Sequence, residues 1–371
     1  MPRVVMDTPL GSILGEERDG CIAWLGVRYA KAVRFGLPSL VESWQPDVYD
    51  ATTEGPSCPQ KPNSESSASQ SEDCLFVNIW LPASGPPPNR TFAFIHGGGF
   101  TSGSIGRIYD GYYQYNGCRL AAERGIAVAT IQYRLGVLGW LAKPVANLGL
   151  RDQAAALRFT RRLLGPVASS RVLLGGQSAG SISICAHLFA PRSRGLFDAV
   201  LMMSSNLCPT QPRFVGRMIA DGFLRLSPCR GTVVAAGPQA WGARTLACLR
   251  TLNLTQILAA QGLITEVEEV DAGGWRLKGL DGITGGDEMR SGGEQMRSGG
   301  AEMPPLYSLQ LLWSPLVETS PEPLDAAAAA ASPQLHLGAP ARVPVVIGEV
   351  RGRGIDSRCR LLLCMTMSMT I

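Results

Sequence analysis

Short runs of apolar residues alternate along the middle of the chain with longer stretches of mixed polarity. The runs have the length of buried strands and are Phe92 to Ile95, Ile126 to Gln132, Arg171 to Leu174, Ala199 to Met203 and Val343 to Ile347. Between them, Gln153 to Leu164 and Ser181 to Phe189 have the length of helices. Strands alternating with helices are typical of a largely parallel sheet flanked by helices, so the pattern predicts an α/β fold. Residues 1 to about 90 predict a β-rich cover that precedes this core.

The pentapeptide Gly-Gln-Ser-Ala-Gly at residues 176–180 follows one of these runs and precedes a predicted helix. A strand that breaks into a tight turn before a helix holds a serine hydroxyl above the sheet, and flanking glycines leave room for the neighbouring backbone. A chain with 43 glycines produces such a pentapeptide easily by chance, so the strand, turn and helix order carries the argument. It makes Ser178 a candidate nucleophile.

A second motif, His-Gly-Gly-Gly-Phe at residues 96–100, ends another apolar run. Acyl transfer places negative charge on the former carbonyl oxygen, and backbone N–H groups of Gly98, Gly99 and Ala179 are candidates to bind it. Side chains at these positions would block the approach. The alternative interpretation of the glycines is a flexible loop after a strand.

Several blocks of the sequence, in the same order, resemble the type-B carboxylesterase family, the cholinesterase-like branch of the α/β-hydrolases. They are residues 8–12, 25–30, 58–60, 71–80, 96–100, 133–136, 147–153, 176–180, 313–317 and 343–348. The blocks Glu-Asp-Cys-Leu at 72–75 and Asn-Leu-Gly-Leu-Arg-Asp-Gln at 147–153 are the most specific. The resemblance implies an α/β-hydrolase domain over residues 1–348, a divergent tail over 349–371, and hydrolysis of carboxylic esters through an acyl-enzyme.

The resemblance also implies a triad of Ser, Glu and His, and only part of it carries over. Ser178 matches the nucleophile, and Gln177 stands where the family usually has Glu. The family's acid position is Arg353, which cannot stabilise an imidazolium, although Glu349 and Asp356 are nearby carboxylates. The family's histidine comes later, in a stretch that this chain does not possess.

The chain has three histidines, and none fits the catalytic role. His96 belongs to the glycine motif, His187 lies on the helix after Ser178 and points away from the turn, and His336 lies in a connection rich in Ala and Pro. We therefore expect an esterase that is impaired in this chain. The alternative is a catalytically inactive, cholinesterase-like binding or adhesion module.

Ten cysteines raise the question of disulfides. The resemblance pairs Cys58 with Cys74 and Cys229 with Cys248, and reduced, buried thiols are the alternative for each pair. The sequence names no partner for the remaining six, which are Cys21, Cys118, Cys185, Cys208, Cys359 and Cys364. No spacing of Cys and His indicates zinc, and no metal or other cofactor is expected.

Composition and charge limit the kinds of partner that the chain is expected to bind. With 371 residues, 45% of them hydrophobic, and a net charge of +4, the chain is expected to fold as one globular unit that binds neither nucleic acid nor an anionic membrane. A small ester is the expected substrate; the sequence does not determine which ester or the oligomeric state. Cysteines and the sequons at Asn89 and Asn253 indicate the secretory route, whereas the first residues lack a secretory signal. The alternatives are a chain that starts late or a cytoplasmic protein.

Two segments differ from the rest of the chain. A Gly-rich insertion at about 273–303 contains two near copies of a seven-residue unit, at 286–292 and 293–299, and is expected to be a mobile surface loop. The run Ala326 to Ala331 predicts a short helix or linker. From Glu349 onward the chain departs from the family, which indicates a truncated or frameshifted end, with a genuine short form as the alternative.

Overall fold

The computed structural model describes residues 1–44, 48–62, 69–109, 111–165, 171–204, 211, 213–232, 241–264, 266–270, 274–278 and 345–348. The predictions made for His336, for the alanine run and for the tail after Gly348 lie outside these residues. The same holds for the Gly-rich insertion after Lys278.

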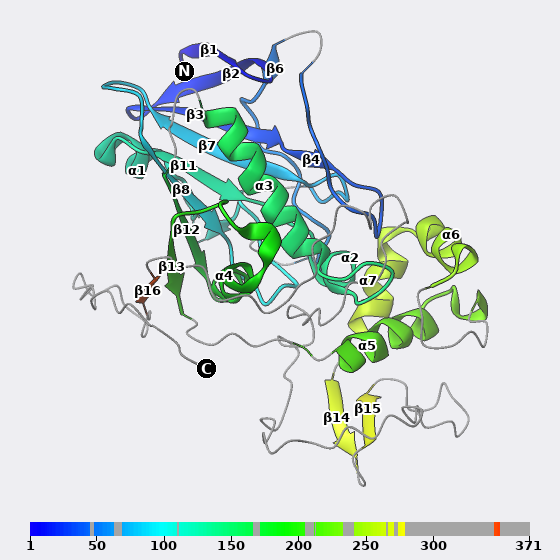
Figure 1. The fold of residues 1–371 in the computed structure, drawn as a ribbon. Coiled ribbons are helices and arrows are strands. Elements are labelled where there is room, and N and C mark those ends of the chain that lie inside the picture. The colour runs from blue at the N-terminus through cyan, green and yellow to red at the C-terminus, as the bar shows by residue number, and fades with distance from the viewer. Residues whose placement is uncertain are drawn as a thin grey trace.

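One ten-stranded sheet runs through the described part of the protein in the order β1-β2-β3-β7-β11-β8-β12-β13-β16, with β6 added beside β2 (Figure 1). Its strands are β1 (Arg3–Thr8), β2 (Gly11–Arg18), β3 (Cys21–Arg28), β6 (Tyr49–Asp50), β7 (Phe76–Pro82), β8 (Arg90–Ile95), β11 (Ala127–Ile131), β12 (Arg171–Gln177), β13 (Ala199–Met203) and β16 (Val345–Gly348). The strand pairs from β1 to β11 along this order are antiparallel, and those from β11 through β8, β12 and β13 to β16 are parallel. The predicted α/β sheet and its β-rich cover are confirmed.

Seven α-helices accompany this sheet in the described ranges. They are α1 (Cys118–Arg124), α2 (Gly136–Trp140), α3 (Leu148–Leu164), α4 (Ala179–Phe189), α5 (Arg213–Leu226), α6 (Ala243–Thr251) and α7 (Leu254–Gly262). Short 3-10 helices occupy Pro191–Ser193 and Arg230–Thr232. Helix α3 begins five residues before the predicted stretch, and its first residue, Leu148, is buried.

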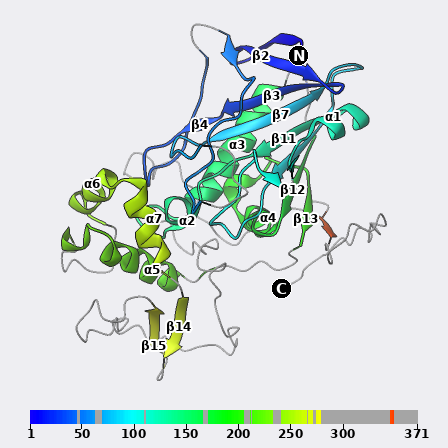
Figure 2. The same cartoon turned by 180° about the vertical axis from the view of Figure 1, so that it is seen from behind.

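Alternate residues of the central strands face opposite sides of the sheet, as the period of a strand requires. Trp24, Ile79 and Ala129 join the large core, which includes much of α3 and α4. Their chain neighbours Trp80 and Val128 join a smaller cluster under α1. Seen from behind, the strands lie in front of α3, so α3 and α1 cover opposite faces (Figure 2).

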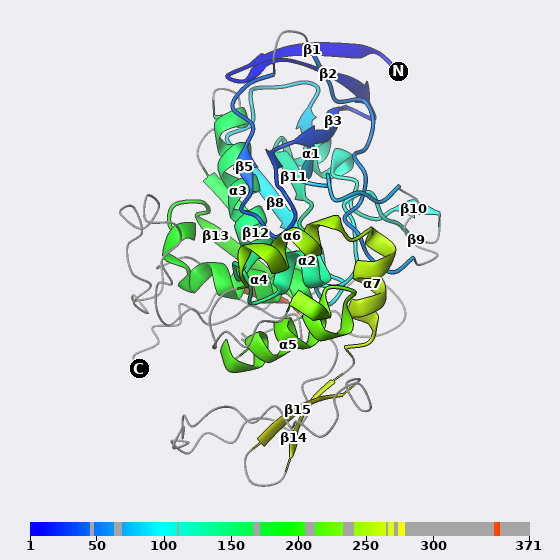
Figure 3. The same cartoon turned by 90° about the vertical axis from the view of Figure 1, so that its right-hand side faces the viewer.

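Helices α5, α6 and α7 gather beside α2 (Figure 3), and Figure 1 shows this group to one side of the strands. Two small antiparallel pairs are separate from the large sheet. They are β14 (Glu266–Val270) with β15 (Gly274–Lys278), and β9 (Ile108–Tyr109) with β10 (Tyr112–Tyr113). A third pair joins β4 (Ala30–Lys31) to β5 (Ser39–Leu40). Strand β15 occupies the first residues of the predicted Gly-rich insertion, where a loop was expected, because an apolar and basic stretch there pairs with β14 before the glycine repeats begin.

Three disulfides tie the described elements together. Cys58 is bonded to Cys74 and Cys229 to Cys248, the pairs that the resemblance implies. The third bond joins Cys21 of β3 to Cys118 of α1, two residues for which the sequence named no partner. They are 97 residues apart, so only the packing of α1 on β3 brings them together. Cys185 also takes part in a disulfide.

Candidate active site

The two motifs lie at the carboxyl ends of neighbouring parallel strands. Strand β8 pairs with β12 so that Ile95 is the register partner of Gly176. His96 therefore leaves β8 at the level at which Gln177 ends β12. Loops that follow adjacent parallel strands emerge on the same edge of the sheet, where α/β proteins build their binding sites.

Ser178 occupies the turn between β12 and α4 with φ 54° and ψ −118°. A positive φ is uncommon for a residue with a side chain and stores backbone strain. Two backbone hydrogen bonds hold it: Ser178 N–H donates to the carbonyl of Met203 at 2.9 Å, and its own carbonyl accepts from Ile182 N–H at 3.0 Å. The turn is thus fixed by a neighbouring strand and by the helix that it opens.

Glycines on both sides of the turn are required by close backbone approach. A Cβ on Gly176 would lie 2.6 Å from the carbonyl carbon of Gly180. A Cβ on Gly180 would lie 2.1 Å from the carbonyl oxygen of Ile95 in β8. Both distances are too short for any side chain, so the pentapeptide pattern has a steric cause here.

The glycine loop lies against the serine turn. A Cβ on Gly97 would lie 2.5 Å from Gln177 Oε1 and 3.2 Å from Ser178 Cβ. Gly98 and Gly99 follow with φ of 112° and 59°, and the carbonyl of Gly98 accepts from Ser102 N–H at 3.0 Å. The structure therefore brings Gly97 and Ser178 together from segments about eighty residues apart in sequence.

Aromatic packing supports the loop from below. Phe100 is fully buried and lies 4.4 Å, between ring centroids, from Trp140 of α2. The ring of Tyr133 stacks on His96 at 4.5 Å, and its hydroxyl donates to the carbonyl of His96 at 2.9 Å. The sequence did not single out Tyr133 or Phe100 as supports, although both lie within the resemblance blocks.

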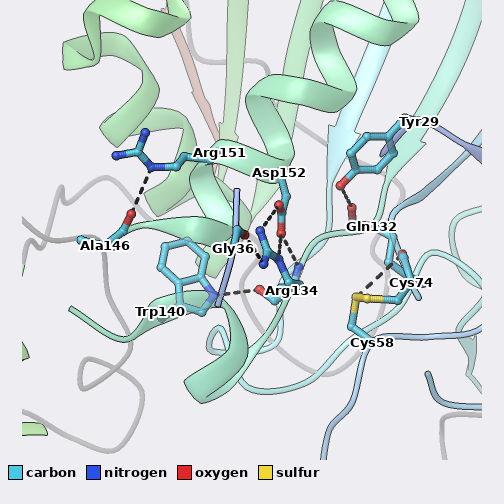
Figure 4. A network of polar contacts seen from close by, with 10 residues as sticks. All are labelled: Tyr29, Gly36, Cys58, Cys74, Gln132, Arg134, Trp140, Ala146, Arg151 and Asp152. Carbon is cyan, nitrogen blue, oxygen red and sulfur yellow. Dashed lines mark hydrogen bonds and ion pairs between the residues drawn. A yellow bond between two sulfur atoms is a disulfide. The ribbon is translucent and has the colours of Figure 1, made fainter. Parts of the chain in front are cut away.

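Beneath this packing, the strand-to-helix loop after β11 is held by a buried ion pair (Figure 4). Arg134 donates from Nε and Nη2 to the two carboxylate oxygens of Asp152, each at 2.7 Å. Its Nη1 donates to the carbonyl of Gly36 at 2.8 Å, and Trp140 Nε1 donates to the carbonyl of Arg134 at 3.1 Å. These bonds fix the position of Trp140, whose ring packs against Phe100.

Both described histidines are buried, and neither has a hydrogen bond to Ser178 among the described contacts; the buried Nε2 of His96 has no partner there. His96 Nδ1 bonds the carbonyl oxygen of Gly97 at 2.8 Å. His187 bonds Ser193 through Nδ1 at 2.8 Å and Gln153 through Nε2 at 2.9 Å. Burial lowers the pKa of each to about 4, and Arg158 adds to this effect at His187. The packed role that we predict for His187 agrees with these contacts, and Glu349, Arg353 and Asp356 lie outside the described residues.

The described residues give no sign of a metal site or a membrane-spanning helix. Over these ranges, no group of three or more His, Cys, Asp or Glu side chains is placed to hold a metal ion. None of the helices in the same ranges reaches the length and hydrophobicity that a membrane crossing requires.

Comparison with known proteins gives consistent results. The model of the carboxylesterase family matches residues 2–276. Para-nitrobenzyl esterase of Bacillus subtilis (strain 168) is 36% identical over 222 residues, which cover 55% of this chain and 44% of that protein. Acetylcholinesterase 4 of Caenorhabditis briggsae is 34% identical over 284 residues, which cover 68% of this chain and 44% of that protein.

A solved structure of a PNB esterase matches the fold with a TM-score of 0.60 at 33% identity, over 70% of this chain and 53% of that one. The chain thus spans about half the length of the proteins it matches.

Proposed function

The chain belongs to the carboxylesterase family, and from this we propose that it acts on carboxylic esters with the hydroxyl of Ser178 as nucleophile. One observation carries the proposal: Gly97 packs against Ser178, so a strained serine turn and a glycine loop share one edge of the sheet. This pairing suits acyl transfer, which needs a nucleophile and N–H donors around one carbonyl group.

In the proposed reaction, Ser178 Oγ attacks the ester carbonyl carbon, and the tetrahedral oxyanion is bound by the N–H groups of Gly98, Gly99 and Ala179. Ala179 is the first residue of α4, so its N–H has no partner within the helix. The alcohol leaves with the proton of Ser178, and water then hydrolyses the acyl-enzyme. Loss of one such donor costs about 10²- to 10³-fold in rate.

The proton of Ser178 needs an acceptor, and the described histidines do not offer one. His187 is bonded to Ser193 and Gln153, and His96 faces Gly97 and Tyr133. The sequence also has Arg353 at the family's acid position. We therefore expect impaired turnover in this chain, near the ~10³- to 10⁴-fold acceleration that an oxyanion hole and binding alone retain.

No described hydrogen bond joins either of these histidines to Ser178, and this also favours a second candidate, a binding or adhesion module without catalysis. The two candidates differ in one respect that is measured directly. A binding module has no need of a reactive Ser178, whereas the esterase does.

Covalent labelling tests the proposal. The purified protein is incubated with a fluorophosphonate probe, and the modified peptide is identified by mass spectrometry. We expect slow labelling at Ser178 and none in Ser178→Ala. Hydrolysis of a short-chain p-nitrophenyl ester is followed in the same two proteins, and equal rates would rule out the serine mechanism and leave the binding module.

The disulfides are compatible with an oxidising compartment. We accordingly propose that the protein follows the secretory route. Membership in the carboxylesterase family supports a small ester as its substrate. The described residues from Arg3 to Gly348 supply one continuous sheet, which supports a single hydrolase domain over residues 1–348.

A further inference from the structure

The start of α7 presents at the surface a sequence motif that the proposed function does not use. Asn253, Leu254 and Thr255 form the acceptor pattern for N-linked glycosylation. Asn253 and Thr255 are both exposed, whereas Leu254 between them packs against the core. The folded protein thus turns the two recognised side chains outward.

Asn253 is also the N-cap of α7, and its two amide atoms have different tasks. Oδ1 accepts from the backbone N–H of Gln256 at 2.9 Å, while Gln256 Oε1 accepts from the backbone N–H of Asn253 at 3.0 Å. This reciprocal pair is a capping box. Among the described residues, no hydrogen bond involves Asn253 Nδ2. A glycosidic bond is made to Nδ2, so a glycan and the helix cap are compatible.

The backbone before Asn253 is anchored to the body of the protein. Arg34 Nη1 donates to the carbonyls of Leu249 and Leu252, at 2.8 and 2.6 Å, and the same guanidinium pairs with Glu72. The Cys229–Cys248 disulfide closes the preceding loop. A fixed backbone with an outward amide keeps an attached sugar in water, where it displaces no packed side chain.

We propose that Asn253 is an N-glycosylation site. Asn253 Nδ2 forms a bond to C1 of the terminal sugar of a polyprenyl-diphosphate-linked oligosaccharide. The bond from C1 to the diphosphate oxygen breaks, the diphosphate leaves with the electron pair, and the amide loses one proton. The three disulfides are compatible with the oxidising compartment in which this transfer occurs.

The other Asn-x-Thr sequence, at Asn89, differs in one respect. Asn89 is exposed, but Thr91 is only 4% exposed and pairs within β8 with the neighbouring strands. Its hydroxyl is therefore accessible only before β8 joins the sheet. Thr255 stays accessible after folding, which singles out Asn253.

The test uses the full chain expressed behind a cleavable secretory leader in a eukaryotic host, with Asn89→Gln so that one acceptor sequence is left. We expect peptide N-glycosidase F to increase the mobility of the protein on a denaturing gel. Digestion in heavy-oxygen water is expected to convert residue 253 to a labelled Asp, detected by mass spectrometry.

Matched variants separate the effect of losing the glycan from the effect of losing the helix cap. Thr255→Val and Asn253→Asp both remove the acceptor pattern and keep a capping oxygen, so we expect the mobility shift to vanish and the unfolding midpoint to match that of the deglycosylated protein. Thr255→Ser keeps the pattern and the shift. Cell lysate and medium are both digested, and a disulfide-bonded pool with unmodified Asn253 would overturn the proposal. No ester substrate is involved, so this result is independent of the proposed esterase activity.

Discussion

At the scale of single residues, the approach of Gly97 to Ser178 is the contact on which the proposed site depends. Gly97→Ala would place a Cβ 2.5 Å from Gln177 Oε1 and 2.8 Å from the carbonyl oxygen of Gln177. The side-chain amide can move, but the carbonyl belongs to the end of β12. We expect the serine turn to shift and fluorophosphonate labelling of Ser178 to slow by about 10²-fold.

Gly231→Ala is the matched control for this substitution, because a Cβ there meets nothing within 4 Å. Its labelling rate should equal that of the wild type. Equal rates for Gly97→Ala as well would show that the loop and the turn do not depend on each other.

The buried Arg134–Asp152 ion pair is a second place where a single substitution is expected to change the stability strongly. Both side chains are buried, at 5% and 0% exposure, and Asp152→Asn would leave the guanidinium without its counter-charge. We expect the free energy of unfolding to fall by about 3–5 kcal/mol, measured in urea. Glu123→Gln breaks the exposed pair with Arg119 and should leave the unfolding midpoint unchanged. A similar midpoint for Asp152→Asn would contradict the structural role of the pair.

At the scale of elements, the Cys21–Cys118 bond joins the N-terminal strands to α1. Both residues are buried in the smaller cluster, so alanine replaces them without exposing a polar group. We expect the double variant Cys21→Ala, Cys118→Ala to lose about 2–4 kcal/mol of stability, since the bond closes a loop between residues 97 positions apart.

Denaturant unfolding under oxidising and reducing conditions checks this expectation. The free energy of unfolding of the wild type should exceed that of the variant only when the disulfides are intact. In excess reductant the two values should become equal. A gap of the same size in both conditions would mean that packing, and not the bond, accounts for the difference.

At the scale of the whole molecule, the buried histidines make stability depend on pH. The pKa of His187 falls from 6.5 to about 4 on folding, so below pH 6.5 the unfolded chain binds a proton that the folded chain does not. Stability is therefore complete above pH 6.5 and decreases as the pH falls toward 4, by about 1.4 kcal/mol per pH unit for one such histidine. His96 acts in the same direction.

His187→Gln isolates this contribution from those of all other groups. The stability advantage of the wild type over the variant should be constant above pH 6.5 and shrink between pH 6.5 and 4, measured by urea unfolding at several pH values. An advantage that does not change over this interval would show that His187 takes up a proton in the folded state.

Much of the fold followed from local pattern, because the period and length of apolar runs reflect which face of an element is buried. Ala199 to Met203 was predicted with the bounds that β13 has, and β8, β11, β12 and β16 differ from prediction by one to three residues at an end. Helix α4 begins at Ala179, two residues before the predicted stretch, since the turn at Ser178 passes directly into the helix.

The sequence by itself determined the α/β fold and the strand, turn and helix around Ser178, because these depend on the pattern of residues close in the chain. Tertiary structure decided what lies next to what: Gly97 against Ser178, Cys21 against Cys118, and His187 between Ser193 and Gln153. These contacts join distant segments, and their geometry is set by the order and register of the strands and by the packing of helices on them. No local pattern encodes that register, since each strand alone is compatible with many neighbours.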